Sequence, residues 1–155
     1  MITLENNELV IRFPEVHRDA VARVAFQRTL RIPDDGRDYP LPPGLGEFPL
    51  HHVEDHAERL PATWLRRGGV FMPMYQSEAL WLYFGGNDYP IALQIAAGKI
   101  NAVTGEPWQD EPQFDPQGYV VTSRQPWLDG FCVEKGRIRQ FVAAPLGQGF
   151  TVQAP

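Results

Sequence analysis

Thiols are almost absent from this sequence. Its 155 residues include one cysteine, Cys132, so no disulfide can form within the chain, and a free thiol fits a reducing compartment. No apolar run approaches the roughly 18 residues that cross a bilayer, and the N-terminus, MITLENNELV, lacks the basic region and apolar block of a signal peptide. We therefore expect a soluble, cytoplasmic protein with no membrane partner.

An excess of positive charge is absent as well. The formal net charge is -5 and the pI is about 5.3, so the chain has no broad basic field of the kind that binds nucleic acid. The sequence is still compatible with a local basic patch, because Arg23, Arg28 and Arg31 are close together. We expect no nucleic-acid partner, whereas a protein partner, a small molecule or a homo-oligomer is compatible with the composition.

Long uninterrupted segments are excluded by 15 prolines and 14 glycines, which divide the chain into short pieces. The apolar content of 43% is nevertheless enough for one sizeable core. We expect residues 1–155 to form a single domain.

Alternation of apolar and polar residues predicts most of the secondary structure. Strands are predicted at residues 9–13, 70–74, 79–84, 91–95, 99–103, 119–122, 131–134, 137–143 and 150–152. Residues 21–33 fit a strand better than the rival helix, because the run becomes β-branched and stops at a proline. Residues 79–84 are apolar on both faces, which predicts a central strand that is covered on both sides and is followed by a meander to residue 103.

Two segments are rich in turn-forming residues. Residues 33–49 contain five prolines and three glycines, so they cannot sustain a helix or a ladder. We expect a surface connection with four apolar anchors, Tyr39, Leu41, Leu45 and Phe48; a ligand-covering lid is the alternative. Residues 104–118 are expected to make a second surface excursion.

Helical spacing occurs between residues 53 and 67. Val53, Ala57 and Leu60 share one face up to Pro61, and a second helical turn at residues 61–67 ends at Gly68, a left-handed cap. Together the patterns predict an α+β fold, mainly antiparallel β, as a compact barrel or strongly bent sheet with one or two short helices.

The sharpest candidate for chemistry lies where the predicted helix starts. His51, His52 and His56 are three of the four histidines, and a helix would place His52 and His56 one turn apart, with Glu54 near both. Such a set can bind one metal ion. The alternative is a solvated helix start, since the glutamate of the zincin pattern is replaced by Val53.

A second candidate is the polar bend inside the most apolar stretch. Tyr75, Gln76 and Glu78 could line a ligand pocket, although an exposed structural turn at Ser77 and Glu78 is favoured. Cys132 lies in an apolar strand pattern, which favours a small buried hydrophobe over a nucleophile.

Three blocks, MPMYQSEALWL, GKINAVTGEPW and QPWLDGFCVEKGRIRQFVAAPLGQGFTV, resemble a family of uncharacterised bacterial proteins. The resemblance covers residues 39–152 and implies no particular activity, cofactor or catalytic residue. It implies that related chains continue beyond the position of Pro155, so this chain is either a short member or the N-terminal part of a longer pattern.

No assembled catalytic set is visible in the sequence. A non-catalytic binding or protein-interaction module is therefore our first expectation. The alternatives are a metal-dependent enzyme that uses His51, His52 and His56, and a structural subunit of a larger assembly.

Overall fold

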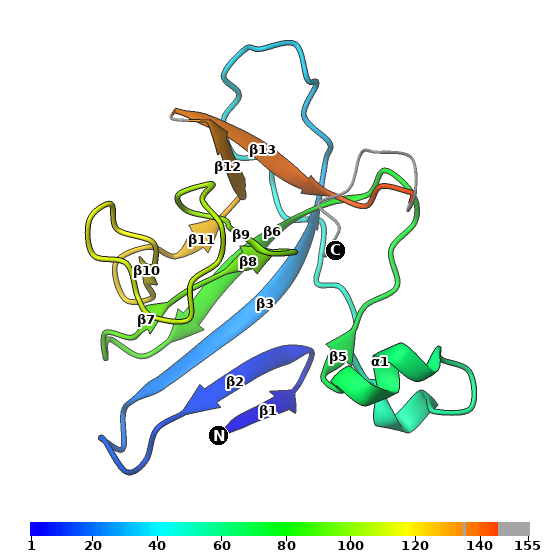
Figure 1. The fold of residues 1–155 in the computed structure, drawn as a ribbon, viewed down its shortest axis with the longest axis vertical. Coiled ribbons are helices and arrows are strands. Elements are labelled where there is room, and N and C mark those ends of the chain that lie inside the picture. Colours follow the sequence, from blue (N-terminus) through cyan, green and yellow to red (C-terminus); the bar gives the residue numbers. More distant parts are fainter. Residues whose placement is uncertain (135, 146–155) are drawn as a thin grey trace.

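An antiparallel sheet of seven strands dominates the computed structural model, which describes residues 1–134 and 136–145 (Figure 1). The strands follow the spatial order β1-β2-β3-β6-β13-β12, and β11 pairs with β6 beside this path. Their bounds are Ile2–Glu5 for β1, Glu8–Arg12 for β2, Val21–Thr29 for β3, Ala79–Gly86 for β6, Trp127–Leu128 for β11, Gly130–Glu134 for β12 and Arg137–Val142 for β13.

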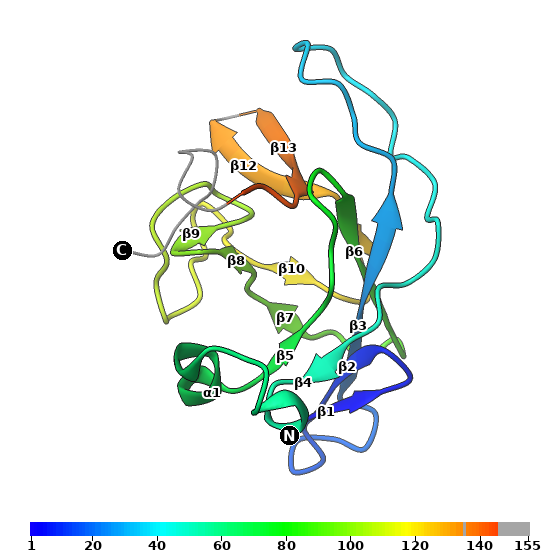
Figure 2. The same cartoon turned by 90° about the vertical axis from the view of Figure 1, so that its right-hand side faces the viewer.

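Smaller elements lie on one side of this sheet. Two-stranded sheets join β4 (His51–His52) to β5 (Val70–Phe71), β7 (Ala92–Leu93) to β10 (Val120–Val121) and β8 (Ala96–Ala97) to β9 (Ile100–Asn101). Figure 2 shows the sheets β7-β10 and β8-β9 on the left of β3 and β6, with the segment of residues 30–48 on the right. The described helical elements are a 3-10 turn at Glu54–His56 and the α-helix α1 at Ala62–Arg67.

Strand β6 is the centre of the fold. It pairs with β3 in an unbroken register from Ala79 to Gly86. Its other edge is shared, because β13 meets the start of β6 at Ala79 and β11 meets it further along at Tyr83. The prediction of a central strand at residues 79–84 is therefore confirmed.

One face of β6 carries the core. Leu80, Leu82 and Phe84 are buried, and β7, β10 and residues that flank β8 and β9 contribute side chains to the same cluster. The main buried partners are Val24, Phe48, Ala102, Val120 and Leu128. The opposite face was predicted to be covered as well, and this is only partly correct: Trp81 is half-buried against Gly44, whereas Tyr83 is 40% exposed.

The last residues of the long connection at residues 33–49 pair with the edge of β3. The backbone N–H of Arg28 donates to the carbonyl of Gly46 (2.8 Å), and the N–H of Phe48 donates to the carbonyl of Phe26 (2.8 Å). This segment therefore continues the edge pairing of β3 beyond β2. Phe48 is the buried anchor, whereas Tyr39 and Leu45 are exposed.

The helical prediction is correct only in its second half. Residues 62–67 form α1, and Gly68 follows at its C-cap with a positive φ of 65°, which favours glycine, although its ψ of -159° differs from the left-handed helical conformation that was expected. Residues 53–60 contain only the short 3-10 turn. His51 and His52, directly before this turn, pair as a strand with β5, so the chain enters the turn from a sheet.

Other differences concern pairing. The sheet is open and not strongly curled: in the described chain β1 and β12 end the strand order without pairing with each other, so the predicted barrel is not formed. Residues 92–93 pair with β10 instead of continuing a meander from β6, and β1 was not predicted. The strands predicted at residues 131–134 and 137–143 pair as the hairpin of β12 and β13, while Lys135 between them and the strand predicted at residues 150–152 lie outside the described residues.

A charged network covers the start of the sheet. Arg12 donates to both carboxylate oxygens of Glu5, at 2.6 and 2.9 Å, and Arg23 lies 3.1 Å from Glu8. The hydrogen bonds from Arg12, followed by the one from Thr3, lower the pKa of Glu5 from 4.5 to about 2. Because Arg23 is paired here with carboxylates, it does not contribute to a free basic patch.

Glu5→Gln should make the protein less sensitive to acid. The pKa of Glu5 is lower in the fold than its ordinary value of 4.5, so ionised Glu5 stabilises the fold above that value and loses this effect as the pH falls toward about 2. Urea unfolding across this window should show a smaller fall in unfolding free energy for Glu5→Gln than for the wild type. Glu58→Gln, at an exposed position, is the control. Equal pH slopes for all three proteins would contradict the assignment.

Candidate functional site

Three aromatic side chains form the candidate site, which we name the aromatic strip: Trp81, Tyr83 and Trp127. Successive residues of a strand point to opposite faces, so Trp81 and Tyr83 face away from the core that Leu80 and Leu82 build. Trp127 is the register partner of Tyr83, and directly paired residues share a face of the sheet. The strip therefore lies on the outer face of the central sheet.

Two of the rings, those of Trp81 and Tyr83, pack against each other, and Trp127 lies beside Tyr83 in the register. The ring centroids of Trp81 and Tyr83 are 6.4 Å apart with an interplanar angle of 76°, an edge-to-face pair. Tyr83 is 40% exposed and Trp127 is 45% exposed. A Cβ atom on Gly85 would lie 3.3 Å from Cε1 of Tyr83, so the absence of a side chain at Gly85 leaves room for the tyrosine ring.

The Trp81 end of the strip is covered by the chain itself. A Cβ atom on Gly44 would lie 3.3 Å from Cζ2 of Trp81 and 3.1 Å from Oε1 of Gln27, so the backbone at Gly44 runs against the indole. The hydroxyl of Thr29 donates to the carbonyl of Pro43 (2.9 Å) and fixes this segment. The indole Nε1 of Trp81 is shielded from solvent and has no hydrogen-bond partner in the described part of the chain.

The charges beside the strip are balanced. Arg23, opposite Gly85 on β3, lies 3.1 Å from Glu8 and 4.0 Å from Glu5. The side-chain amide of Gln27, opposite Trp81, donates to Glu47 (3.3 Å). The surroundings therefore favour neither a strongly charged anion nor a cation.

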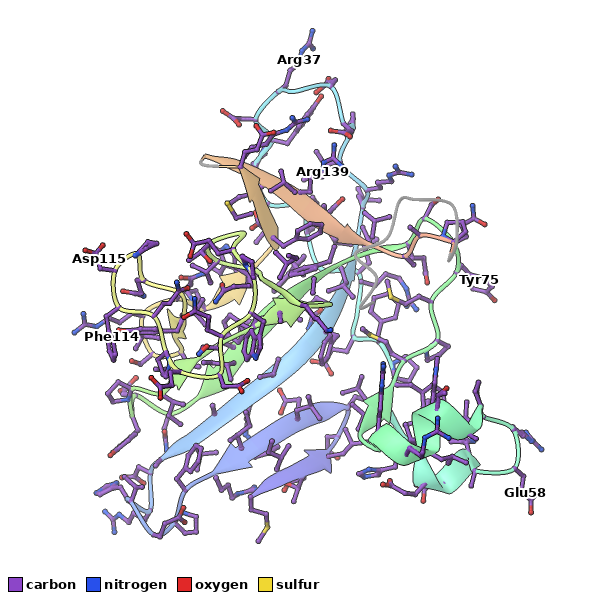
Figure 3. The ribbon with its side chains drawn as sticks, viewed as in Figure 1. Arg37, Glu58, Tyr75, Phe114, Asp115 and Arg139 are labelled. Carbon is purple, nitrogen blue, oxygen red and sulfur yellow. The ribbon has the colours of Figure 1, made fainter. Side chains whose placement is uncertain are left out.

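The predicted ligand residues lie elsewhere, in a tight turn before β6. The N–H of Glu78 donates to the carbonyl of Tyr75 (3.1 Å), and Ser77 has a φ of 71°, as the third position of a type II turn requires. Tyr75 is 83% exposed and points outward, as Figure 3 shows, and Gln76 is exposed beside it.

The carboxylate of Glu78 is held by hydrogen bonds within the chain. One carboxylate oxygen accepts from Nε of Arg28 (2.9 Å) and the other from the N–H of Tyr75 (2.8 Å). The guanidinium of Arg28 also lies 4.3 Å from the ring centroid of Phe48. The expectation that Glu78 is exposed is wrong, since its side chain is only 22% exposed, whereas a ligand pocket at Tyr75, Gln76 and Glu78 stays a prediction.

The histidines pack against aromatic rings. The rings of His51 and His56 are 5.3 Å apart, and each lies within 5.5 Å of Phe71, which also contacts Trp64 at 6.0 Å. These four residues form a small aromatic cluster between β4, β5 and α1. His52 is exposed, because its neighbour on β4 points toward the cluster.

The helical spacing on which the metal site was predicted is absent. His52 lies in β4 and not on a helix with Glu54 and His56. Among residues 1–134 and 136–145, no group of three or more His, Cys, Asp or Glu side chains is placed to hold a metal ion. Cys132 is half-buried, and its thiol donates to the carbonyl of Glu134 (3.1 Å).

The sequence indicated only part of the aromatic strip. Trp81 and Tyr83 alternate with Leu80 and Leu82, but their apolar character suggested a second buried face. Trp127 gave no local signal, because its pairing with Tyr83 joins segments that are far apart in the chain.

Comparison with protein-family models, curated proteins and solved structures finds no match for this chain. The resemblance to a bacterial family therefore stays an expectation. None of the helices described here is long and apolar enough to cross a membrane.

Glu78→Ala should lower the free energy of unfolding by about 1 to 2 kcal/mol, because it removes the acceptor of two hydrogen bonds, one of them charged. Gln76→Ala in the same turn should change it by less than about 0.5 kcal/mol, because Gln76 is exposed. Urea unfolding of both variants measures the difference. Equal losses would show that the Arg28–Glu78 pair does not hold the turn.

His56→Ala should lower the free energy of unfolding by about 1 kcal/mol, because it removes a ring that packs on His51 and Phe71. His52→Ala, at an exposed position, should leave it nearly unchanged. Thermal unfolding with and without zinc gives a second readout. A zinc-dependent rise in Tm that His52→Ala abolishes would instead support the predicted metal site.

Proposed function

We propose that this protein is a non-catalytic binding module whose contact surface is the aromatic strip. The observation that carries the proposal is the exposure of Tyr83 and Trp127 side by side on two paired strands. Contiguous exposed apolar surface on a soluble domain commonly marks an interaction site, and Trp and Tyr are the residues most enriched among binding hot spots.

The position of the strip supports the same conclusion. Its rings lie on the face of β6 opposite the core, so they contribute less to the hydrophobic core than Leu80 and Leu82 do. Regular strands hold the side chains in place before a ligand arrives, which lowers the entropic cost of binding. A rigid aromatic surface of this kind suits recognition of a partner better than chemistry on a substrate.

The proposed partner is another protein, a second copy of this chain or a small molecule. The free thiol of Cys132 supports a reducing compartment such as the cytoplasm. If the strip instead docks the protein permanently into an assembly, the purified chain should associate with itself or with a stable partner chain.

The proposal predicts different costs for two neighbours on β11. Trp127→Ala should lower the free energy of unfolding by about 1 kcal/mol, whereas Leu128→Ala, which empties a core position opposite Leu82, should lower it by about 3 kcal/mol. Urea unfolding measures both. A loss at Trp127 as large as that at Leu128 would show that the strip belongs to the core of the fold.

Binding itself is tested by titrating the protein with chemically distinct probes: decaproline, cellohexaose and a short single-stranded DNA. At least one probe should change the tryptophan fluorescence of the wild type, and Trp127→Ala should abolish that change. Trp64→Ala is the matched control, because Trp64 is also 45% exposed but lies on α1. The absence of any response to all three probes would contradict the proposal.

A further inference from the structure

We infer that the aromatic strip binds an extended, proline-rich peptide segment of another protein. This inference rests on the proposed binding function and specifies the chemistry of the ligand. Three independent features of the structure carry it: the hydrogen-bonding character of the strip, the segment of this chain that already lies on it, and the charge around it.

The exposed end of the strip offers a donor that needs an acceptor. The indole N–H of Trp127 can only donate, and the hydroxyl of Tyr83 donates as readily as it accepts, whereas the N–H of Trp81 is shielded from solvent. A proline-rich segment matches this set, because proline offers a carbonyl acceptor and has no N–H of its own. A polyproline II chain also leaves its carbonyls without internal partners. Sugar hydroxyls, by contrast, each bring a donor that needs an acceptor.

A proline-rich segment of this chain already lies at one end of the strip. Residues 40–44 have the sequence PLPPG, and the backbone at Gly44 runs against the indole of Trp81. The carbonyl of Pro43 accepts a hydrogen bond from Thr29, which lies on the same outer face as Trp81. The outer face thus binds the backbone of a proline-rich segment through a side-chain donor next to an aromatic ring.

This internal segment stops short of the rest of the strip. It turns to the edge of β3, where the N–H of Leu45 donates to the carbonyl of Arg28 (2.7 Å). Tyr83 and Trp127 remain exposed beyond it. An external peptide that packs its pyrrolidine rings on these two side chains would continue the apolar surface that the internal segment begins at Trp81.

The charge around the strip favours an uncharged ligand. Arg23 is paired with Glu8 and Glu5, and Gln27 is bonded to Glu47, so no unpaired cation of β3 faces the strip to attract a phosphate backbone. The net charge of the chain, -5, repels nucleic acid in general. Aromatic surfaces without strong charge are the usual docking sites of polyproline II segments, whose low conformational entropy favours binding.

The test uses a blocked decaproline peptide and isothermal titration calorimetry with the full chain. Wild-type protein should bind decaproline, and Trp127→Ala and Tyr83→Ala should each weaken binding by about tenfold or more. Tyr83→Phe keeps the ring and removes the donor, so it should weaken binding by only about twofold to fivefold. Trp64→Ala should bind as the wild type does. Thermal unfolding confirms that every variant is folded.

A Gly-Ser decamer and cellohexaose separate the outcomes. Neither should bind, because the Gly-Ser decamer lacks rigid apolar rings and cellohexaose presents hydroxyl donors to which the indole of Trp127 offers no acceptor. Binding of cellohexaose that depends on Trp127, without binding of decaproline, would overturn this inference and leave the proposed binding function intact. Decaproline binding that is indifferent to Trp127 and Tyr83 would overturn the inference as well. If no probe engages the strip, both the inference and the proposed function fail.

Discussion

Pairing of β6 along both of its edges fixes the side of the sheet to which each of its residues points. Because side chains alternate along a strand, a register shift of one residue would exchange the buried leucines with Trp81 and Tyr83. The long register with β3 and the shared edge with β13 and β11 exclude such a shift. The core on one face and the aromatic strip on the other are two consequences of the same pairing.

A second set of contacts joins parts of the chain that are distant in sequence. Arg28 on β3 pairs with Glu78 in the turn before β6 and lies over the ring of Phe48 at the end of the long connection. One guanidinium therefore ties the edge segment, the central pair of strands and the turn together. The cost of closing the long connection is offset here by a buried aromatic ring and a charge-assisted hydrogen bond.

Alternation of apolar and polar residues, together with turn-forming residues, correctly predicted several strands and turns. Strands β2, β3 and β6 and the hairpin of β12 and β13 follow from alternation and turn residues, and the end of α1 at Arg67 follows from the glycine after two arginines. The same patterns did not predict which strands pair with each other. Residues 92–93 pair with β10, and Trp127 meets Tyr83, because these contacts are set by the packing of the whole domain.

In the candidate sites, too, local spacing was predictable from the sequence but long-range contacts were not. His52 and His56 are four residues apart, but His52 lies in β4 and only a short 3-10 turn follows at Glu54–His56, so the helix on which the metal hypothesis depended is not formed. Glu78 was expected in solvent and instead bonds to a residue on another strand, which no local pattern indicates. Trp81 and Tyr83 were recognised as apolar, yet only the three-dimensional arrangement shows that the chain covers Trp81 and leaves Tyr83 exposed on the same face of β6.

The most direct measurement is fluorine NMR of protein labelled with 5-fluorotryptophan, because the four tryptophans report from different parts of the molecule. Single Trp→Phe variants assign the resonances. On addition of decaproline, the resonance of Trp127 should move most and that of Trp81 should move with it, while Trp64 and Trp108 stay in place. Movement of Trp64 or Trp108 with no change at Trp127 would contradict the assignment of the outer face of β6 as the binding surface.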